Sequence, residues 1–162
     1  MTEVIDPNAR IADLVGLLYV LTNIFNGKTD LYKLEKEMEV DLDDLMPIVY
    51  TAVNLGFVTL DSGDINVTEK GREFARAGIK KRKEMIRDSI KNMEPFITSL
   101  NMKKFTIQEL MEELVKKNIY QYNSPSGYHD LEVILIEWGI YSGLLKKEED
   151  YFIINMVKSG KA

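Results

Sequence analysis

Apolar residues recur every three or four positions along the first third of the chain. This spacing predicts three amphipathic helices, over about 9–26, 30–38 and 42–55. After Gly56 the period falls to two, and two short alternating runs flank the turn residues 61–64. Alternation around a polar, glycine-containing turn is typical of a β-hairpin. The pattern therefore predicts three helices followed by a hairpin.

The second half of the chain repeats this order. Thr68 begins a long helical stretch, with bends expected at Gly78 and Pro95, and Thr106 caps a further helix. A loop near 118–127 precedes a helix over about 128–142, and runs at 144–145 and 151–154 form another hairpin. Sliding the sequence by 87 places Gly56-Phe57-Val58 on Gly143-Leu144-Leu145, whereas Lys28-Thr29 corresponds to Phe105-Thr106.

Three helices followed by a hairpin is the order of a winged helix, a variant of the helix-turn-helix motif. The sequence thus predicts a mainly α fold with small β-hairpin wings, arranged as tandem winged-helix domains. We expect the first domain at 1–78, a basic linking helix at 79–101 and the second domain at 102–162. The apolar stripe from Ile86 to Leu100 either fills a core or forms a homodimer interface.

The composition of the chain bears on its cellular location. The 162 residues contain no cysteine, which excludes disulfides and thiolate metal sites and is typical of a cytoplasmic protein. No apolar run is long enough to span a membrane, and the N-terminus lacks the features of a signal peptide. We therefore expect a cytoplasmic protein without membrane insertion.

The charged residues that give the net charge of −5 are distributed unevenly along the chain. Residues 67–104 carry 11 basic and 5 acidic side chains, whereas residues 1–66 carry 4 basic and 12 acidic ones. The basic region predicts a candidate interaction surface formed by Arg76, Lys80, Lys81, Arg82, Lys83, Arg87 and Lys91. This surface has three interpretations. It is a solvated interdomain helix, or it binds an acidic partner (including the chain's own acidic lobes), or it binds nucleic acid.

The third helix of each predicted domain argues against the usual mode of DNA binding. A winged helix inserts its third helix into the major groove, and phosphate contacts supply much of the affinity. Neither the stretch that begins Asp41-Leu42-Asp43-Asp44 nor the one from Tyr128 to Glu137 contains Lys or Arg. Nucleic acid is therefore a disfavoured partner.

The other motifs do not indicate a nucleotide, metal or catalytic site. Gly27-Lys28-Thr29 matches the end of a P-loop, but Thr22 replaces the first glycine and the motif follows a helix instead of preceding one. Gly27 is better explained as a helix C-cap, with Thr29 or Asp30 capping the next helix. His129 is the only histidine, so we expect no metal site, and we predict neither catalytic nor cofactor-binding residues.

Aromatic residues suggest one further surface. A pocket or interface formed by the aromatic residues of the second half is an alternative to ordinary core packing. The residues concerned are Tyr120, Tyr122, Tyr128, Trp138 and Tyr141.

Several segments also resemble a known family, the AAA-associated C-terminal domain. The similarity is carried by Asp43–Val49, Asn54–Val58, Gly63–Ala75, Ile79–Lys83, Glu137–Tyr141 and Leu144-Leu145. The resemblance implies a role beside ATPases of nitrate, sulfonate and taurine ABC transporters, in which the domain usually follows the nucleotide-binding domain. The chain has no Walker A motif and no LSGGQ-type signature, so it resembles the appended domain as a separate chain.

These features give three hypotheses. The first is a non-enzymatic regulatory or protein-interaction module, with an ABC transporter ATPase as the partner that the resemblance implies. The second is a DNA-binding transcriptional regulator that docks through its basic helix. The third, an enzyme or small-molecule sensor, is favoured only by the tyrosine-rich loop.

Overall fold

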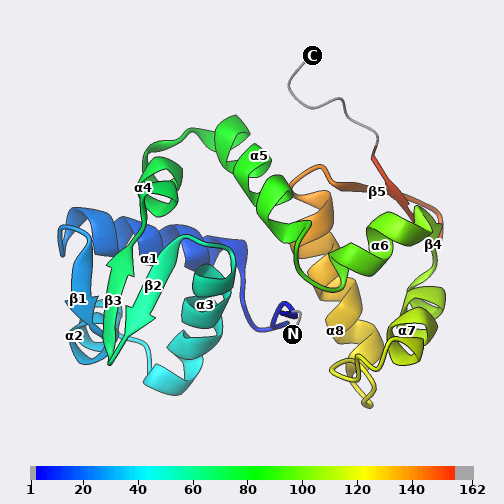
Figure 1. Cartoon of the computed structure of the whole chain (residues 1–162), viewed down its shortest axis with the longest axis horizontal. Coiled ribbons are helices and arrows are strands. Elements are labelled where there is room, and N and C mark those ends of the chain that lie inside the picture. The colour runs from blue at the N-terminus through cyan, green and yellow to red at the C-terminus, as the bar shows by residue number, and fades with distance from the viewer. Residues whose placement is uncertain (1–2, 156–162) are drawn as a thin grey trace. The chain divides into compact units, whose positions relative to one another are not determined.

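The structure, a computed structural model, describes residues 3–155 and divides into two compact units (Figure 1). The first unit comprises Asn8–Arg82. The second unit begins at Lys83 and also includes the N-terminal residues up to Pro7. Each unit has its own small antiparallel sheet, and helices make up most of both. The prediction of a mainly α fold with small β-hairpins is confirmed.

The first unit contains four helices and three strands, followed by the start of α5. Its elements are α1 (Ile11–Asn23), β1 (Lys28–Asp30), α2 (Leu31–Met38), α3 (Leu42–Asn54), β2 (Val58–Asp61), β3 (Asp64–Val67) and α4 (Glu69–Arg76). The sheet has the order β1-β3-β2, with Ile65 of β3 paired to Thr29 and to Leu60. The sequence pattern did not predict β1, because three residues are too few to show a period.

Local sequence signals explain the boundaries of these elements. The Asp30 carboxylate accepts a hydrogen bond from the Lys33 amide at 2.8 Å, and the Thr68 hydroxyl accepts one from the Gly71 amide at 3.0 Å. Gly27 has a φ of 97°, in the left-handed region that favours glycine. Gly27 therefore turns the chain into β1. The helix C-cap predicted at Gly27 was wrong, because α1 already ends at Asn23 with Ile24 as its C-cap.

The second unit repeats this order with a shorter first strand. Its elements are α5 (Ile79–Ile90, which begins in the first unit), α6 (Phe96–Met102), β4 (Lys104–Phe105), α7 (Ile107–Lys116), α8 (Gly127–Ile134), the π-helix η1 (Leu135–Ile140), β5 (Leu145–Glu148) and β6 (Tyr151–Ile154). Its sheet has the order β4-β6-β5. Thr106 and Glu109 cap α7 reciprocally, which confirms the cap predicted at Thr106.

The basic linking helix predicted over 79–101 is interrupted close to Pro95, where a bend was expected. The chain forms two helices, α5 and α6, separated by residues 91–95. Pro95 has no backbone N–H, so a helix cannot continue through it with all its hydrogen bonds. The apolar stripe of this region is mostly interior, because Ile86, Ile90 and Met93 are buried within the single chain.

The two units correspond residue by residue, although the offset between them changes along the chain. In the sheets, Thr29 pairs with Ile65 as Phe105 pairs with Phe152. The counterpart of Thr29 is therefore Phe105, 76 residues away, which corrects the predicted match of Lys28-Thr29 with Phe105-Thr106. The sequence comparison missed this because only the ladder fixes the register of such short strands.

Two insertions account for the change in offset. Buried Leu45, Ile48 and Val49 of α3 match Leu131, Ile134 and Leu135, which lie 86 residues further on. After η1 the offset becomes 87, because Val58 and Leu145 hold equivalent ladder positions. The segment from α7 to the start of α8 thus contains ten extra residues, seven of them in the loop 117–126, and the π-helix contains one. A π-helical turn is the usual way in which a helix accommodates a single inserted residue.

Candidate interaction surfaces

The α3 helix of the first unit exposes an apolar and acidic face. Its buried side includes Leu45 and Val49, which turns Leu42, Asp43 and Tyr50 toward solvent. The Tyr50 side chain is 56% exposed, and no residue of α3 is Lys or Arg. Large exposed apolar side chains beside carboxylates suit contact with a protein better than contact with phosphates.

The corresponding helix of the second unit has the same character. Tyr128 and Ile136 are 51% and 46% exposed, and Ile136 is the counterpart of Tyr50 at the offset of 86. Neither α8 nor η1 contains Lys or Arg. We call these two surfaces the third-helix faces: Leu42, Asp43 and Tyr50 in the first unit, and Tyr128, His129 and Ile136 in the second.

Several residues of the predicted basic surface make internal contacts. The Arg82 guanidinium donates to the carbonyl oxygens of Phe74 and Ala75, both at 3.0 Å, and thereby caps the C-terminus of α4. Arg87 donates to the carbonyl oxygen of Ser142 at 3.2 Å. The Lys83 ammonium lies 5.1 Å from the centre of the Tyr141 ring. These three cations stabilise the fold and are only partly available to a partner.

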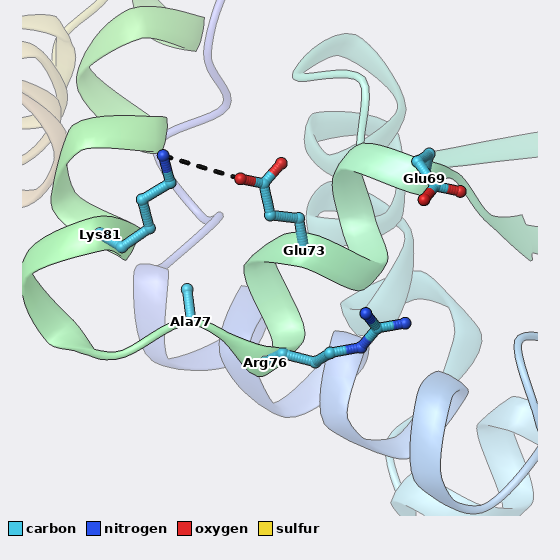
Figure 2. Close-up of a pocket in the computed structure, with 5 residues that line it drawn as sticks. All are labelled: Glu69, Glu73, Arg76, Ala77 and Lys81. Carbon is cyan, nitrogen blue, oxygen red and sulfur yellow. Dashed lines mark ion pairs between the residues drawn. The ribbon is translucent and has the colours of Figure 1, made fainter.

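The exposed cations of this surface are Arg76, Lys80, Lys81 and Lys91. Lys81 forms an ion pair with Glu73 at 3.7 Å beside a hollow of about 410 Å³. Figure 2 shows that these two side chains point toward each other, whereas the Arg76 guanidinium extends away from the pair. Because Glu69 and Glu73 line the hollow together with Arg76 and Lys81, its charges balance and it does not form a cradle for an anion.

The predicted aromatic cluster is distributed among different surroundings. Trp138 is fully buried in the second unit, and Tyr122 is buried with its hydroxyl donating to the Ile5 carbonyl oxygen at 3.0 Å. Tyr120 is exposed and donates to Asn118, and Tyr128 lies on the third-helix face. Burial raises the pKa of Tyr122 far above its ordinary value of 10.0, and the charges of Glu94, Asp6 and Asp130 act in the same direction. Tyr122 therefore stays protonated as a hydrogen-bond donor.

A buried carboxylate in the second unit was not predicted from the sequence. Glu94 is 2% exposed and accepts hydrogen bonds from the Thr98 amide at 3.1 Å and the Thr98 hydroxyl at 3.0 Å. The Lys117 ammonium lies 3.0 Å from the same carboxylate and 2.6 Å from the Thr98 hydroxyl. The sequence E-P-x-x-T marks the local part of this network, but nothing near it indicates Lys117.

Among residues 3–155, no group of three or more His, Cys, Asp and Glu side chains has the arrangement of a metal site. No helix within these residues has the length and apolarity needed to cross a membrane.

Comparison with known families gives one match. Residues 32–148 match the model of the C-terminal AAA-associated domain. The chain belongs to this family. No curated protein matches the chain. The match confirms the resemblance noted in the sequence.

The AAA-associated domain match spans both third-helix faces and all seven cations of the predicted basic surface. It begins in α2 and ends in β5, so it includes residues of both units. Among the described residues, 3–31 and 149–155 lie outside the match.

Proposed function

We propose that this AAA-associated domain is a non-enzymatic regulatory module of winged-helix type that binds the ATPase of an ABC transporter through its third-helix faces. The observation that carries the proposal is that both third helices lack Lys and Arg and expose large apolar side chains, accompanied by exposed carboxylates in the first unit. Family membership supports an ATPase partner, because the family is described as the C-terminal AAA-associated domain. None of the motifs shared with the family contains a catalytic residue.

The winged-helix assignment is supported by topology. In the first unit, helix α1 and strand β1 precede α2 and α3, and the hairpin β2–β3 follows (Figure 1). The first strand pairs with the hairpin to close a three-stranded antiparallel sheet. The second unit has the same order from α6 onward. This order of helices and hairpin supports the proposal of a winged-helix type.

The proposal is tested by adding a cation to each third-helix face. We expect Tyr50→Lys and Ile136→Lys each to weaken binding to an ABC ATPase of the nitrate, sulfonate and taurine type by about tenfold, because exposed aromatic and aliphatic anchors contribute much of the affinity of protein interfaces. Isothermal titration of the full chain against the purified ATPase gives the dissociation constants. Tyr32→Lys is the matched control, because Tyr32 is 64% exposed but lies on α2. Equal affinities for all three variants and the wild type would overturn the assignment of the third-helix faces.

A second candidate function is DNA binding through the basic surface, which the exposed cations Arg76, Lys80, Lys81 and Lys91 favour. The same substitutions separate the two functions, because an added cation strengthens contact with phosphates. If Tyr50→Lys increases affinity for a random duplex and that affinity falls steeply with salt, DNA binding is favoured. Reversing the charge of Lys80 and Lys91 tests the basic surface while leaving the Arg82 cap of α4 intact.

A further inference from the structure

The loop between α7 and α8, residues 117–126, is longer than the equivalent connection of the first unit, residues 39–41 (Figure 1). The first residues of this loop border a hollow of about 450 Å³, together with Val4, Glu94 and Ile97. Small-molecule sites commonly have volumes of about 300–1,000 Å³, and they are often built from loops held on a rigid scaffold. The inserted loop therefore gives the second unit a hollow of the size of a ligand site.

The walls of the hollow are fixed by backbone hydrogen bonds. The Ile119 amide donates to the Leu114 carbonyl oxygen at 2.9 Å, which ties the start of the loop to α7. At another wall, Val4 and Glu94 form an isolated parallel bridge, and the Ile5 amide donates to the Glu94 carbonyl oxygen at 3.0 Å. A ligand entering such a preformed hollow has little of the chain to order.

The Lys117 ammonium provides the hollow with a charged hydrogen-bond donor. An ammonium has three N–H groups, and two of them are directed to the Glu94 carboxylate at 3.0 Å and the Thr98 hydroxyl at 2.6 Å. The Lys117 side chain is 37% exposed, so its third N–H group is accessible to a ligand. The Thr98 amide and hydroxyl also donate to Glu94, so the buried carboxylate does not depend on Lys117 alone. Lys117 is thus oriented to form a charge-assisted hydrogen bond with one further acceptor.

Two carboxamides and an aliphatic wall complete the hollow. The Asn118 carboxamide accepts a hydrogen bond from the Tyr120 hydroxyl at 2.8 Å, which leaves its N–H groups as donors, and Gln121 also lines the hollow. Lys117 and Glu94 are the only charged residues among the described residues that line it. The aliphatic side chains are those of Val4, Ile97 and Ile119. An oriented cation and amide donors beside an aliphatic wall suit a ligand with an anionic head and a short apolar chain.

We propose that this hollow binds a small aliphatic carboxylate. One carboxylate oxygen accepts the third N–H group of Lys117, the other accepts a carboxamide N–H group of Asn118 or Gln121, and the chain packs on the aliphatic wall. Glu94 and Thr98 are positioning residues, because they orient the Lys117 ammonium. None of the described residues of the third-helix faces lines the hollow, so this site goes beyond the proposed function and stands or fails separately from it.

The test titrates the full chain, without an ATPase, with isovalerate and follows the backbone amides by NMR. We expect saturable shifts at Ile97 and at residues 117–121, with a dissociation constant on the order of 1 mM, as suits a ligand of so few atoms. Isovaleramide has the same shape but no charge, and it should bind at least about tenfold more weakly. Acetate lacks the apolar chain, and it should also bind at least about tenfold more weakly because it buries less apolar surface.

Variants of the hollow test the residues that carry the site. Lys117→Gln should weaken isovalerate binding at least about tenfold. Lys116→Gln is the matched control, because Lys116 is 74% exposed and does not line the hollow, and its affinity should equal that of the wild type. Lys117→Gln leaves Glu94 without its counterion, so Lys117→Gln/Glu94→Gln is the second variant, and it should bind as weakly. Ile119→Glu places a like charge in the aliphatic wall and should abolish binding while leaving the Glu94 network intact.

Three outcomes overturn the proposal. The first is the absence of saturable shifts at these amides up to about 50 mM isovalerate. The second is an equal affinity for isovalerate and either analogue, because the hollow then does not recognise both the charge and the chain. The third is an unchanged isovalerate affinity of Lys117→Gln/Glu94→Gln or of Ile119→Glu. The ligand series uses the wild-type chain, so it decides the first two outcomes even if a variant does not fold.

Discussion

The two units have the same order of elements but stabilise it differently. Among the described residues of the first unit, the buried polar residues are Thr29 and Thr51, and the Thr22 hydroxyl oxygen is also buried. The second unit buries Glu94 and four hydroxyl residues, Ser89, Thr98, Ser99 and Ser142, and it also contains an inserted loop and a π-helical turn. The first unit therefore adopts this fold mainly through local sequence signals. The second unit adopts it with the additional help of polar contacts between residues far apart in sequence.

Deleting one residue from each third helix tests this correspondence most severely. Deletion of Tyr50 rotates Thr51, Ala52 and Leu55 by about 100° relative to the core, because an α-helix turns by that angle per residue. We expect the first unit to lose its cooperative unfolding transition. Deletion of Ile136, the equivalent position, removes the extra residue of η1 and lets an α-helix place Trp138 and Gly139 where Thr51 and Ala52 lie.

Thermal unfolding followed by circular dichroism measures both deletions. The Ile136 variant should retain its helical signal and a cooperative transition, at a somewhat lower midpoint. If the two deletions destabilise the protein equally, the π-helix does not contain the extra residue and the assigned offset is wrong.

The next largest effect is expected at Gly71 of α4. A Cβ at this position would overlap the carbonyl oxygen of Phe57, which is fixed by a 3.0 Å hydrogen bond from the Thr68 amide. Gly71→Ala should therefore lower the free energy of unfolding by about 3 kcal/mol, as backbone overlap and overpacking do. Gly78→Ala is the control, because nothing lies within 4 Å of its Cβ. Urea denaturation gives both values, and similar losses would contradict close packing of α4 on the hairpin.

The features that sequence predicted are those with a local signature. Asp30, Thr68 and Thr106 each precede a helix and each accepts a backbone hydrogen bond, as the capping pattern requires. The lack of Lys and Arg in both third helices was also evident, because it depends on helix boundaries and composition alone.

The features that sequence missed depend on partners far along the chain. β1 and β4 are strands only because β3 and β6 pair with them, and the Ile5–Glu94 pairing joins residues 89 positions apart. The same holds for the internal contacts of two cations of the predicted basic surface. The sequence shows that Arg82 and Arg87 are basic and lie on a helix. Only the tertiary structure shows that both donate hydrogen bonds to backbone carbonyl groups.

The buried network of the second unit allows a test of intermediate size. Lys117→Met leaves the Glu94 carboxylate with Thr98 as its remaining donor residue, and we expect a loss of about 2 kcal/mol, since a buried charge without its counterion is costly. Lys116→Met is the control, because Lys116 is 74% exposed and its ion pair with Glu113 is long, at 3.9 Å. Urea denaturation compares the two variants.

The double variant Lys117→Met/Glu94→Gln should be more stable than Lys117→Met alone, and a further loss of stability would show that Lys117 does not act through the charge of Glu94.

The smallest predicted effect is a pH dependence due to Tyr122. Its pKa is raised in the folded chain above the ordinary value of 10.0, so folding favours the protonated phenol. The stability that this group contributes is complete below pH 10 and decreases at higher pH, because the unfolded chain then releases a proton that the folded chain retains. By about pH 11 the wild type should lose about 1 kcal/mol more than Tyr122→Phe, relative to their difference at neutral pH. Tyr120→Phe, which removes an exposed hydroxyl from the same loop, should keep the wild-type profile. Parallel profiles for the wild type and Tyr122→Phe would show that the phenol is not held protonated against Ile5, and that the insertion of the second unit does not restrain the N-terminal segment in this way.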